Sequence, residues 1–171
     1  MTINELIKLI EQWAIDRGLD KNGTVKGQLI KTAEEVAELI IGISKDDIDV
    51  IRDSIGDVFV TLVVGRLISG DKSNLVEVIN DFYKYQKEYK FVDKFDCVQT
   101  IMLNFSDLLI DKSYSEAIHV KINTLIMVTE LYELDFTDCI ESAYKEIAGR
   151  KGKVINGTFW KSEDLEKWEE E

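Results

Sequence analysis

The chain contains no proline in its 171 residues. Proline is the residue that most strongly ends or kinks a helix, so nothing of this kind interrupts long helices here. Apolar residues make up 45% of the chain and charged residues 32%, which is enough apolar material for a core and is typical of a folded protein. The length suits one domain. We therefore expect a single all-α domain.

Apolar residues recur at helical spacing along most of the chain, and this spacing predicts amphipathic helices. Residues 75–82 look helical, but residues 83–95 alternate aromatic and charged residues, so the segment 75–95 stays unassigned. Expected N-caps are Thr24, Asp46 or Asp47, and Ser113 or Ser115, and Thr137 opens the last helix. The expected helices cover residues 3–17, 24–43, 46–69, 95–111, 113–134 and 137–148. In the helix over 95–111 we expect Val98, Ile101, Met102, Phe105, Leu108 and Leu109 to face inward.

The net charge of −12 makes a nucleic-acid backbone an unsuitable general partner, because phosphates are bound by clustered Lys and Arg. A nucleotide needs only a local basic site or a metal ion. The apolar runs are too short to span a bilayer, and the N-terminus lacks a signal-peptide layout. We expect the two cysteines, Cys97 and Cys139, to be reduced thiols in the core. We expect a cytoplasmic protein that binds neither nucleic acid stably nor a membrane.

The helix over 24–43 borders its apolar face with carboxylates. Gln28, Lys31, Glu35 and Glu38 follow by steps of three, four and three, so they share one face, and Glu34 lies on the other flank of Glu38. Like charges at this spacing repel each other. Taken alone, the pattern fits a solvated acidic edge equally well. The expected core stripe of this helix is Leu29, Ala33, Val36, Ile40 and Ile43.

Two aspartates, Asp53 and Asp57, interrupt an otherwise apolar stripe of the next helix. Such a stripe should face the core, where unpaired carboxylates are costly and raise each other's pKa. A divalent cation removes this penalty, and oxygen donors without histidine or thiol favour Mg²⁺ or Mn²⁺. The alternative is an aspartate pair at a partly exposed helix start. The full stripe is Val50, Asp53, Asp57, Val60, Val64 and Leu67.

A short turn between these two helices would make them antiparallel and bring their acidic residues to opposite sides of one site. The ligands expected for the metal ion are Glu35, Glu38, Asp53 and Asp57. In the alternative without a metal, the aspartates pair with Arg52 or Lys31.

Two stretches of the chain resemble the MazG-like all-α nucleoside triphosphate pyrophosphohydrolases, whose superfamily includes the dimeric dUTPases. The resemblance covers residues 3–69 and about 136–161. It does not cover 71–135, which we interpret as a helical insertion into a single domain over 1–161, followed by an acidic tail over 162–171. The matching residues are Trp13, Arg17-Gly18, Gln28-x-x-Lys31-x-x-Glu34-Glu35-x-x-Glu38-Leu39, Asp53-x-x-x-Asp57-Val58, and Asp138 through Arg150-Lys151-Gly152-Lys153 and Asn156-Gly157 to Phe159.

The chain departs from the family pattern at one position. The second family motif is usually Glu-x-x-Asp, and Ser54 stands where the glutamate is expected before Asp57. Asp53 lies one residue earlier and has a shorter side chain. Either Asp53 compensates, which we prefer, or the site holds fewer or differently placed metal ions.

The resemblance implies an antiparallel bundle of five to six helices that dimerises or forms pairs of dimers. It implies Mg²⁺-dependent attack of water on the α-phosphorus of a nucleoside triphosphate, giving the monophosphate and pyrophosphate. dUTP and other non-canonical or surplus nucleotides are candidate substrates. The implied catalytic residues are Glu34 or Glu35 as base and Lys31 on a phosphate. The implied substrate-binding residues are Trp13, Gln28, Lys31, Arg150, Lys151, Lys153 and Asn156.

Other interpretations of the same residues remain. Trp13 stacks on the base or fills the core, and the basic cluster binds phosphate or compensates a helix C-terminus. Glu116 and His119 form a Glu-x-x-His, but His119 is the one histidine, so a di-iron site is excluded. The alternative function is a non-catalytic acidic helical protein, either a nucleotide sensor or a protein-interaction module.

Overall fold

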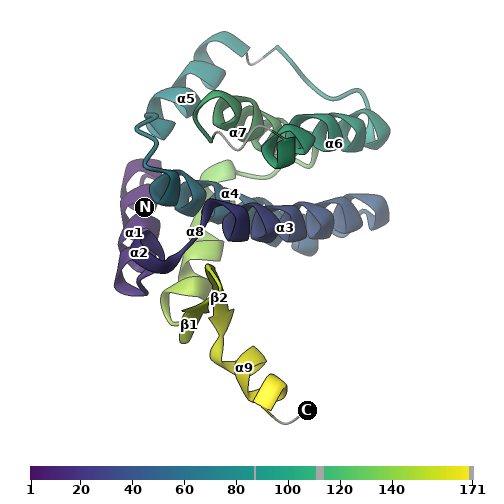
Figure 1. Ribbon diagram of the computed structural model, residues 1–171. Helices are drawn as coiled ribbons and strands as arrows, with labels where there is room; N and C mark the ends of the chain where they lie inside the picture. The colour runs from purple at the N-terminus through teal and green to yellow at the C-terminus, as the bar shows by residue number, and fades with distance from the viewer. Residues whose placement is uncertain (87, 111–113, 170–171) are drawn as a thin grey trace.

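The computed structural model describes residues 1–86, 88–110 and 114–169, and most of them are helical (Figure 1). This confirms the predicted all-α fold class, while dimerisation stays a prediction. Within the described ranges, no helix combines the length and the apolar character needed to cross a membrane. The helices are α1 (Ile3–Asp16), α2 (Leu19–Asn22), α3 (Val25–Lys45), α4 (Ile48–Ser69), α5 (Leu75–Asp81), the π-helix η1 (Phe82–Gln86), α6 (Lys94–Ile110), α7 (Tyr114–Leu131), α8 (Phe136–Ala148) and α9 (Ser162–Glu169).

Side-chain caps fix where α3 and α4 begin. The Thr24 hydroxyl accepts a hydrogen bond from the Gly27 amide, and the Asp47 carboxylate accepts one from the Val50 amide. Two expected N-caps are therefore confirmed. The prediction that Thr137 opens the last helix is wrong by one residue, because Asp135 caps α8. Of the two candidates for the cap of the helix before it, Ser113 lies outside the described residues, and Ser115 is not the cap because it lies inside α7, which begins at Tyr114.

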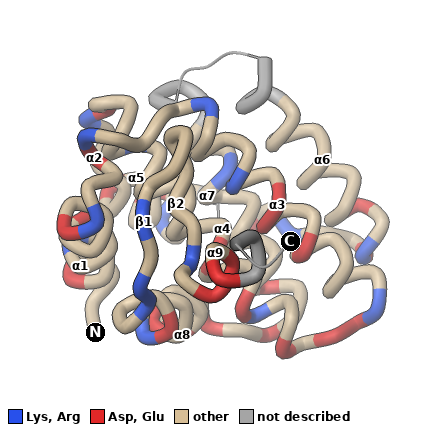
Figure 2. The backbone as a smooth tube through the Cα atoms, turned by 60° about the horizontal axis from the view of Figure 1, so that its bottom comes forward, with Lys and Arg blue, Asp and Glu red and all other residues tan. Residues whose placement is uncertain are grey.

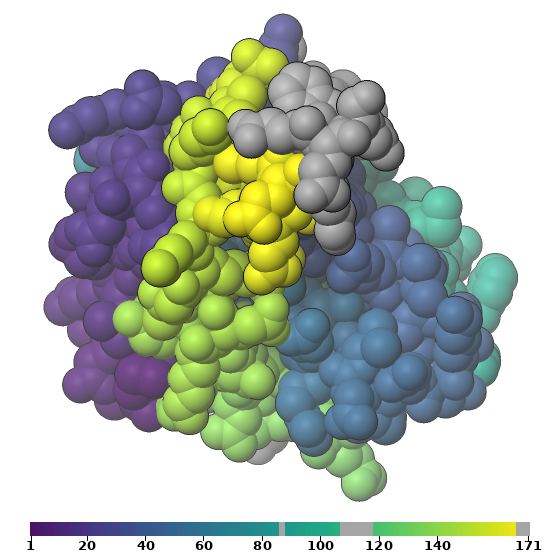
Figure 3. All heavy atoms as spheres, turned by 90° about the horizontal axis from the view of Figure 1, so that it is seen from below, coloured from purple at the N-terminus to yellow at the C-terminus, as the bar shows by residue number. Residues whose placement is uncertain are grey.

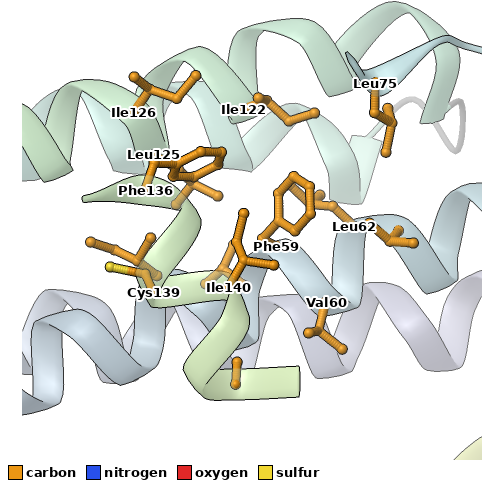
Figure 4. Close-up of a cluster of buried hydrophobic side chains, with 14 of the residues drawn as sticks. Phe59, Val60, Leu62, Leu75, Ile122, Leu125, Ile126, Phe136, Cys139 and Ile140 are labelled. Carbon is orange, nitrogen blue, oxygen red and sulfur yellow. The ribbon is translucent and has the colours of Figure 1, made fainter. Parts of the chain in front are cut away.

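Helix α4 lies at the centre of the fold, and its middle turns are buried on nearly all sides. Figure 4 shows Phe59 and Leu62 of α4 beneath Ile122 and neighbouring residues of α7. The ring of Phe136 on α8 meets Phe59 edge-on, with centroids 5.5 Å apart. Helices α5, α6 and α7 thus share one continuous core with α3, α4 and α8. Cys97 and Cys139 are buried free thiols in that core, as the sequence predicted.

Two details of the expected core are wrong. Ala33 is exposed, because the buried side of α3 is rotated toward Thr32, Glu35 and Leu39. Met102 is 61% exposed, because α6 meets its neighbours through Ile101 and Phe105. In both helices the apolar stripe is wider than the surface that neighbouring helices cover, so periodicity alone does not show where the centre of the buried surface lies. Leu108 and Leu109 lie among side chains that the structure does not describe.

A β-hairpin follows α8, where the sequence predicted only a basic tail. Strand β1 (Gly152–Ile155) pairs antiparallel with β2 (Thr158–Lys161), from Gly152 opposite Lys161 to Ile155 opposite Thr158. The two-residue turn is Asn156–Gly157, and both have positive φ, 51° and 84°. Asparagine and glycine tolerate this conformation, which matches the twist of the strands. The hairpin leads into α9, so the expected acidic tail is helical over its described part.

The hairpin turn is fixed against the start of α3. The Thr24 amide donates to the Gly157 carbonyl oxygen at 3.0 Å. A Cβ atom on Gly27 would lie 2.7 Å from that same oxygen, so only glycine permits the contact. The Asn-Gly turn and Gly27 therefore place the hairpin over the first turns of α3.

Replacing Gly56 by alanine is expected to lower the free energy of unfolding by about 1–3 kcal/mol, the usual cost of overpacking. A Cβ atom there would lie 2.4 Å from the Cys139 carbonyl oxygen and 2.6 Å from Ala143 Cβ, at the contact of α4 with α8. Gly149→Ala is the control, because a Cβ at Gly149 meets nothing within 4 Å. Urea unfolding measures both. Equal stability of the two variants would contradict the close packing of α4 on α8.

Candidate functional site

A cavity of about 440 Å³ lies between α1, α3, α4, the end of α8 and the hairpin. In Figure 3 the C-terminal segment, yellow-green to yellow, crosses this face between the purple N-terminal residues and the blue part of the chain. Residues far apart in the sequence thus meet at one site. The residues of the sequence-based site that line the cavity are Trp13, Gln28, Lys31, Glu34, Glu35, Asp57 and Arg150.

Lys31 holds the two glutamates that follow it on α3. Its Nζ lies 2.6 Å from Glu35 Oε1 and 3.0 Å from Glu34 Oε1. Glu35 is buried, with 5% of its surface exposed, whereas Glu34 lies at the rim. Burial alone would lower the pKa of Lys31, but the hydrogen bonds to Glu35 and Glu34 outweigh it and raise that pKa. The buried carboxylate is therefore neutralised from within its own helix.

The part of the α4 stripe that begins at Asp57 faces this cavity rather than the closed core. Asp57 lines the cavity together with Val60 and Val64, one and two turns further along α4. The prediction that the whole stripe is buried is wrong at its start. Val50 and Asp53 are exposed, because they lie in the first turns of α4, beyond the cover of the hairpin.

The alternative pairing of the aspartates is not found among the described residues. Arg52 lies 3.6 Å from Asp49, and Lys31 pairs with the glutamates of α3. No ion pair of the described residues includes Asp53 or Asp57. Their charges are therefore left to act on each other.

Burial and neighbouring charges raise three carboxyl pKa values at this site. Burial, then Glu35 and Asp53, raise the pKa of Asp57 to about 7. Partial desolvation, then the charge of Glu146, raise the pKa of Asp53, while Arg150 opposes the shift. Partial desolvation, then Glu35, raise the pKa of Glu38. The carboxylates of α3 and α4 are thus close enough to disfavour one another's charge.

The donor chemistry of this cluster fits a hard divalent cation. Its donors are carboxylate oxygens, and their raised pKa values mark a site where positive charge is needed. In the ranges that the structure describes, no three carboxylate, histidine or cysteine side chains converge into a ready ligand cluster. Lys31 holds Glu34 and Glu35 instead. The residues that fit a cation by type and charge are Glu35, Glu38, Asp53 and Asp57.

Trp13 is part of the core and also a wall of the cavity. Its indole Nε1 donates to the Ile147 carbonyl oxygen at 2.7 Å, and its ring meets Phe159 edge-on at 5.4 Å between centroids. The Arg17 guanidinium lies 4.7 Å over the ring. These contacts fix Trp13 in place. Gln28 is fixed as well, since its amide donates to the Thr61 carbonyl oxygen at 3.2 Å.

The basic cluster after α8 is divided by the fold. Arg17 donates twice to the Arg150 carbonyl oxygen, at 2.6 and 3.1 Å, which fixes the backbone where the hairpin begins. The Arg150 side chain pairs with Glu146 and lines the cavity. Lys151, Lys153 and Asn156 are exposed and do not line this cavity.

Sequence reasoning missed the residues that the hairpin and α9 bring to the site. Asn156-Gly157 between β-forming residues is a strong hairpin signal, and it could have revealed these positions. Because the sequence predicted only a tail over residues 149–161, it did not place these residues at the site. The missed residues that line the cavity are Thr158, Phe159, Trp160, Lys161 and Asp164.

Comparison with known proteins finds a phage relative. No protein-family model matches the chain, and no solved structure matches it. The chain is 52% identical over 62 residues to an uncharacterized 18.2 kDa protein from the rep-hol intergenic region of Haemophilus phage HP1 (strain HP1c1). The match covers 36% of this chain and 38% of that protein's length. It relates part of the chain to a phage protein and carries no function with it.

Replacing Asp57 by asparagine is expected to change stability in a pH-dependent way. Because the pKa of Asp57 is raised from 3.8 to about 7, the folded state holds a proton that the unfolded state releases between these values. Wild-type stability therefore falls as pH rises through this window. Asp57→Asn removes the penalty, so it should exceed wild type by about 1–2 kcal/mol near pH 8, after allowance for solvent screening, and match it near pH 4.

Urea unfolding at both pH values measures this difference. Asp49→Asn is the matched control, because the Asp49 side chain is 93% exposed, and this variant should not be more stable than wild type near pH 8. A loss of stability in Asp57→Asn near pH 8 would contradict the repulsion between these carboxylates.

Proposed function

We propose that the protein is a Mg²⁺-dependent nucleoside triphosphate pyrophosphohydrolase that converts a nucleoside or deoxynucleoside triphosphate to the monophosphate and pyrophosphate. One observation carries the proposal. Asp57, whose pKa is raised by burial and by the charges of Glu35 and Asp53, lies with Glu35 at a cavity that also has cationic and aromatic walls. A nucleotide with its metal ion has the matching chemistry, because it brings positive charge to the carboxylates and a flat apolar base to the rings.

The metal ion would neutralise phosphate charge and acidify a bound water when it is present. If Glu35 gave up its ion pair with Lys31 to bind the metal ion, Lys31 would be released to pair with a phosphate. This exchange would couple arrival of the metal and nucleotide to the ion pair on α3. The residues that would hold the ion are Glu35, Glu38, Asp53 and Asp57.

Glu34 suits the role of base. It lines the cavity at the rim, and its carboxylate is the more exposed partner of Lys31. The oxygen of a water would attack the α-phosphorus, and its proton would pass to Glu34. The bond from the α-phosphorus to the bridging oxygen would break, and pyrophosphate would leave with the bond electrons.

The aromatic walls suit the nucleoside. Trp13, Phe159 and Trp160 line one cavity with Gln28, whose amide is held by Thr61. These groups offer stacking surface and a fixed hydrogen-bonding edge. dUTP and other non-canonical or surplus nucleotides are the candidate substrates, and we propose a cytoplasmic location, where such nucleotides are present.

We also propose that the protein acts as a homodimer or as a pair of dimers. The outer side of α3 exposes Ile30 and Ile41, and α6 exposes Met102 and Leu103. Exposed apolar side chains gathered on neighbouring helices are typical of a surface that pairs with a second copy. Ile30 also lines the cavity, so this surface reaches the proposed site.

A nucleotide sensor without hydrolysis is the second candidate. Ser54, which stands in place of the family glutamate, is buried and 3% exposed. It supplies no carboxylate, and Lys31 already neutralises Glu35. This arrangement favours a protein that binds nucleotide but lacks one metal ligand.

Glu38→Gln is expected to lower the rate of pyrophosphate release at least about a hundredfold, because it removes one oxygen donor for the ion. Glu38 is exposed, so the variant should fold. The assay measures pyrophosphate released from a panel of canonical and modified nucleoside triphosphates, with Mg²⁺, Mn²⁺ or a chelator. Asp49→Asn is the control and should keep the wild-type rate.

Three results of this assay would change the proposal. Release of single phosphates without pyrophosphate would point to stepwise dephosphorylation. Nucleotide binding without any turnover would favour the sensor. If the folded protein with Mg²⁺ neither binds nor hydrolyses any nucleotide, this result would contradict a nucleotide function and favour an acidic protein-interaction module.

A further inference from the structure

A second cavity adjoins the first at the end of the hairpin. Its volume is about 490 Å³, and it lies between the end of α8, the start of β1 and the start of α9. Arg150 and Lys161 line both cavities, and Lys151 lines the second. In Figure 2 Lys and Arg positions mark the hairpin strands beside the acidic positions of α9. Glu146 and Glu163 also line the second cavity, so its wall is mixed in charge, and the residues common to the two cavities are the cations Arg150 and Lys161.

Lys161 is the cation at this boundary that has no carboxylate partner. Arg150 pairs with Glu146, but none of the ion pairs of the described residues includes Lys161. Lys161 is only partly exposed. Its positive charge also acts on Asp53, which places it within electrostatic range of the acidic cluster. A lysine at the boundary of two cavities, without a carboxylate partner among the described ion pairs, is free to bind an anion that enters either cavity.

The backbone around Lys161 is held on both sides. Lys161 pairs with Gly152 across the hairpin, and the Ser162 amide donates to the Lys151 carbonyl oxygen at 3.0 Å. A Cβ atom on Gly152 would lie 2.1 Å from the Trp160 carbonyl oxygen, so glycine lets the strands close there. The backbone position of Lys161 is thus set by the fold before any ligand arrives.

We infer that Lys161, together with Arg150 and Lys151, forms a binding subsite for the pyrophosphate end of a nucleotide, with the nucleoside in the adjoining cavity. This inference rests on the proposed function, which it deepens by giving the leaving group a place. As the bond from the α-phosphorus breaks, negative charge grows on the departing pyrophosphate. A fixed cation at the boundary would stabilise that charge.

Calorimetric titration of inorganic pyrophosphate into the full chain, with Mg²⁺ present in both solutions, tests the subsite without any need for turnover. Lys161→Met should weaken pyrophosphate binding about tenfold, the usual effect of losing one charge-assisted contact. Lys161→Arg should retain most of the affinity. Lys26→Met is the control, because Lys26 is exposed and lines neither cavity.

Wild-type affinity in Lys161→Met, or no binding of pyrophosphate by the wild type, would overturn the subsite. Equal weakening in Lys161→Met and Lys161→Arg, with a lowered melting temperature in both, would also overturn it, because the hairpin and not the charge would then be responsible. Nucleotide hydrolysis by the wild type separates the two proposals. If the wild type hydrolyses nucleotide and Lys161→Met does not change pyrophosphate binding, the proposed function stands and the subsite is wrong. If Lys161→Met weakens pyrophosphate binding but the wild type hydrolyses no nucleotide, the subsite stands and the proposed function is wrong.

Discussion

The ion pair of Lys31 with the buried Glu35 is the contact on which the site depends. Helix α3 buries this carboxylate against α4, where Asp57 and Asp53 add negative charge. Without Lys31, Glu35 would be a buried charge beside like charges, which is costly. The pair makes the bundle compatible with an acidic interior edge. It also defines what must move when a cation reaches the carboxylates.

The hairpin adds a second wall to this acidic edge and so forms the cavity. Gly27 and the Asn156–Gly157 turn fix one end of the hairpin to α3, and Arg17 fixes the other through the Arg150 carbonyl oxygen. Rings and cations are thereby placed opposite the carboxylates. The site is therefore assembled from both ends of the chain around α4, while α5 to α7 complete the core on the other side.

Helical periodicity and capping residues predicted the long helices and the start of α4 at Asp46 or Asp47, because both signals are local in sequence. The acidic residues of α3 and α4 were also found from spacing. The exposure of Asp53 and Met102 was not predicted, because periodicity indicates which face of a helix is buried but not how much of that face a neighbouring element covers. Lys161 was missed because its place follows from the pairing of two strands. The Asn-Gly turn signals that pairing, but nothing local shows which cavity it closes.

The central claim is that the carboxylates of α3 and α4 form one site for a divalent cation. Electron paramagnetic resonance of Mn²⁺ titrated with the protein measures this directly, because bound and free Mn²⁺ give different spectra. The wild type should bind Mn²⁺, and Asp57→Asn combined with Glu38→Gln should abolish this binding while the protein stays folded. Absence of bound Mn²⁺ in the wild type, or equal binding by the double variant, would contradict the claim.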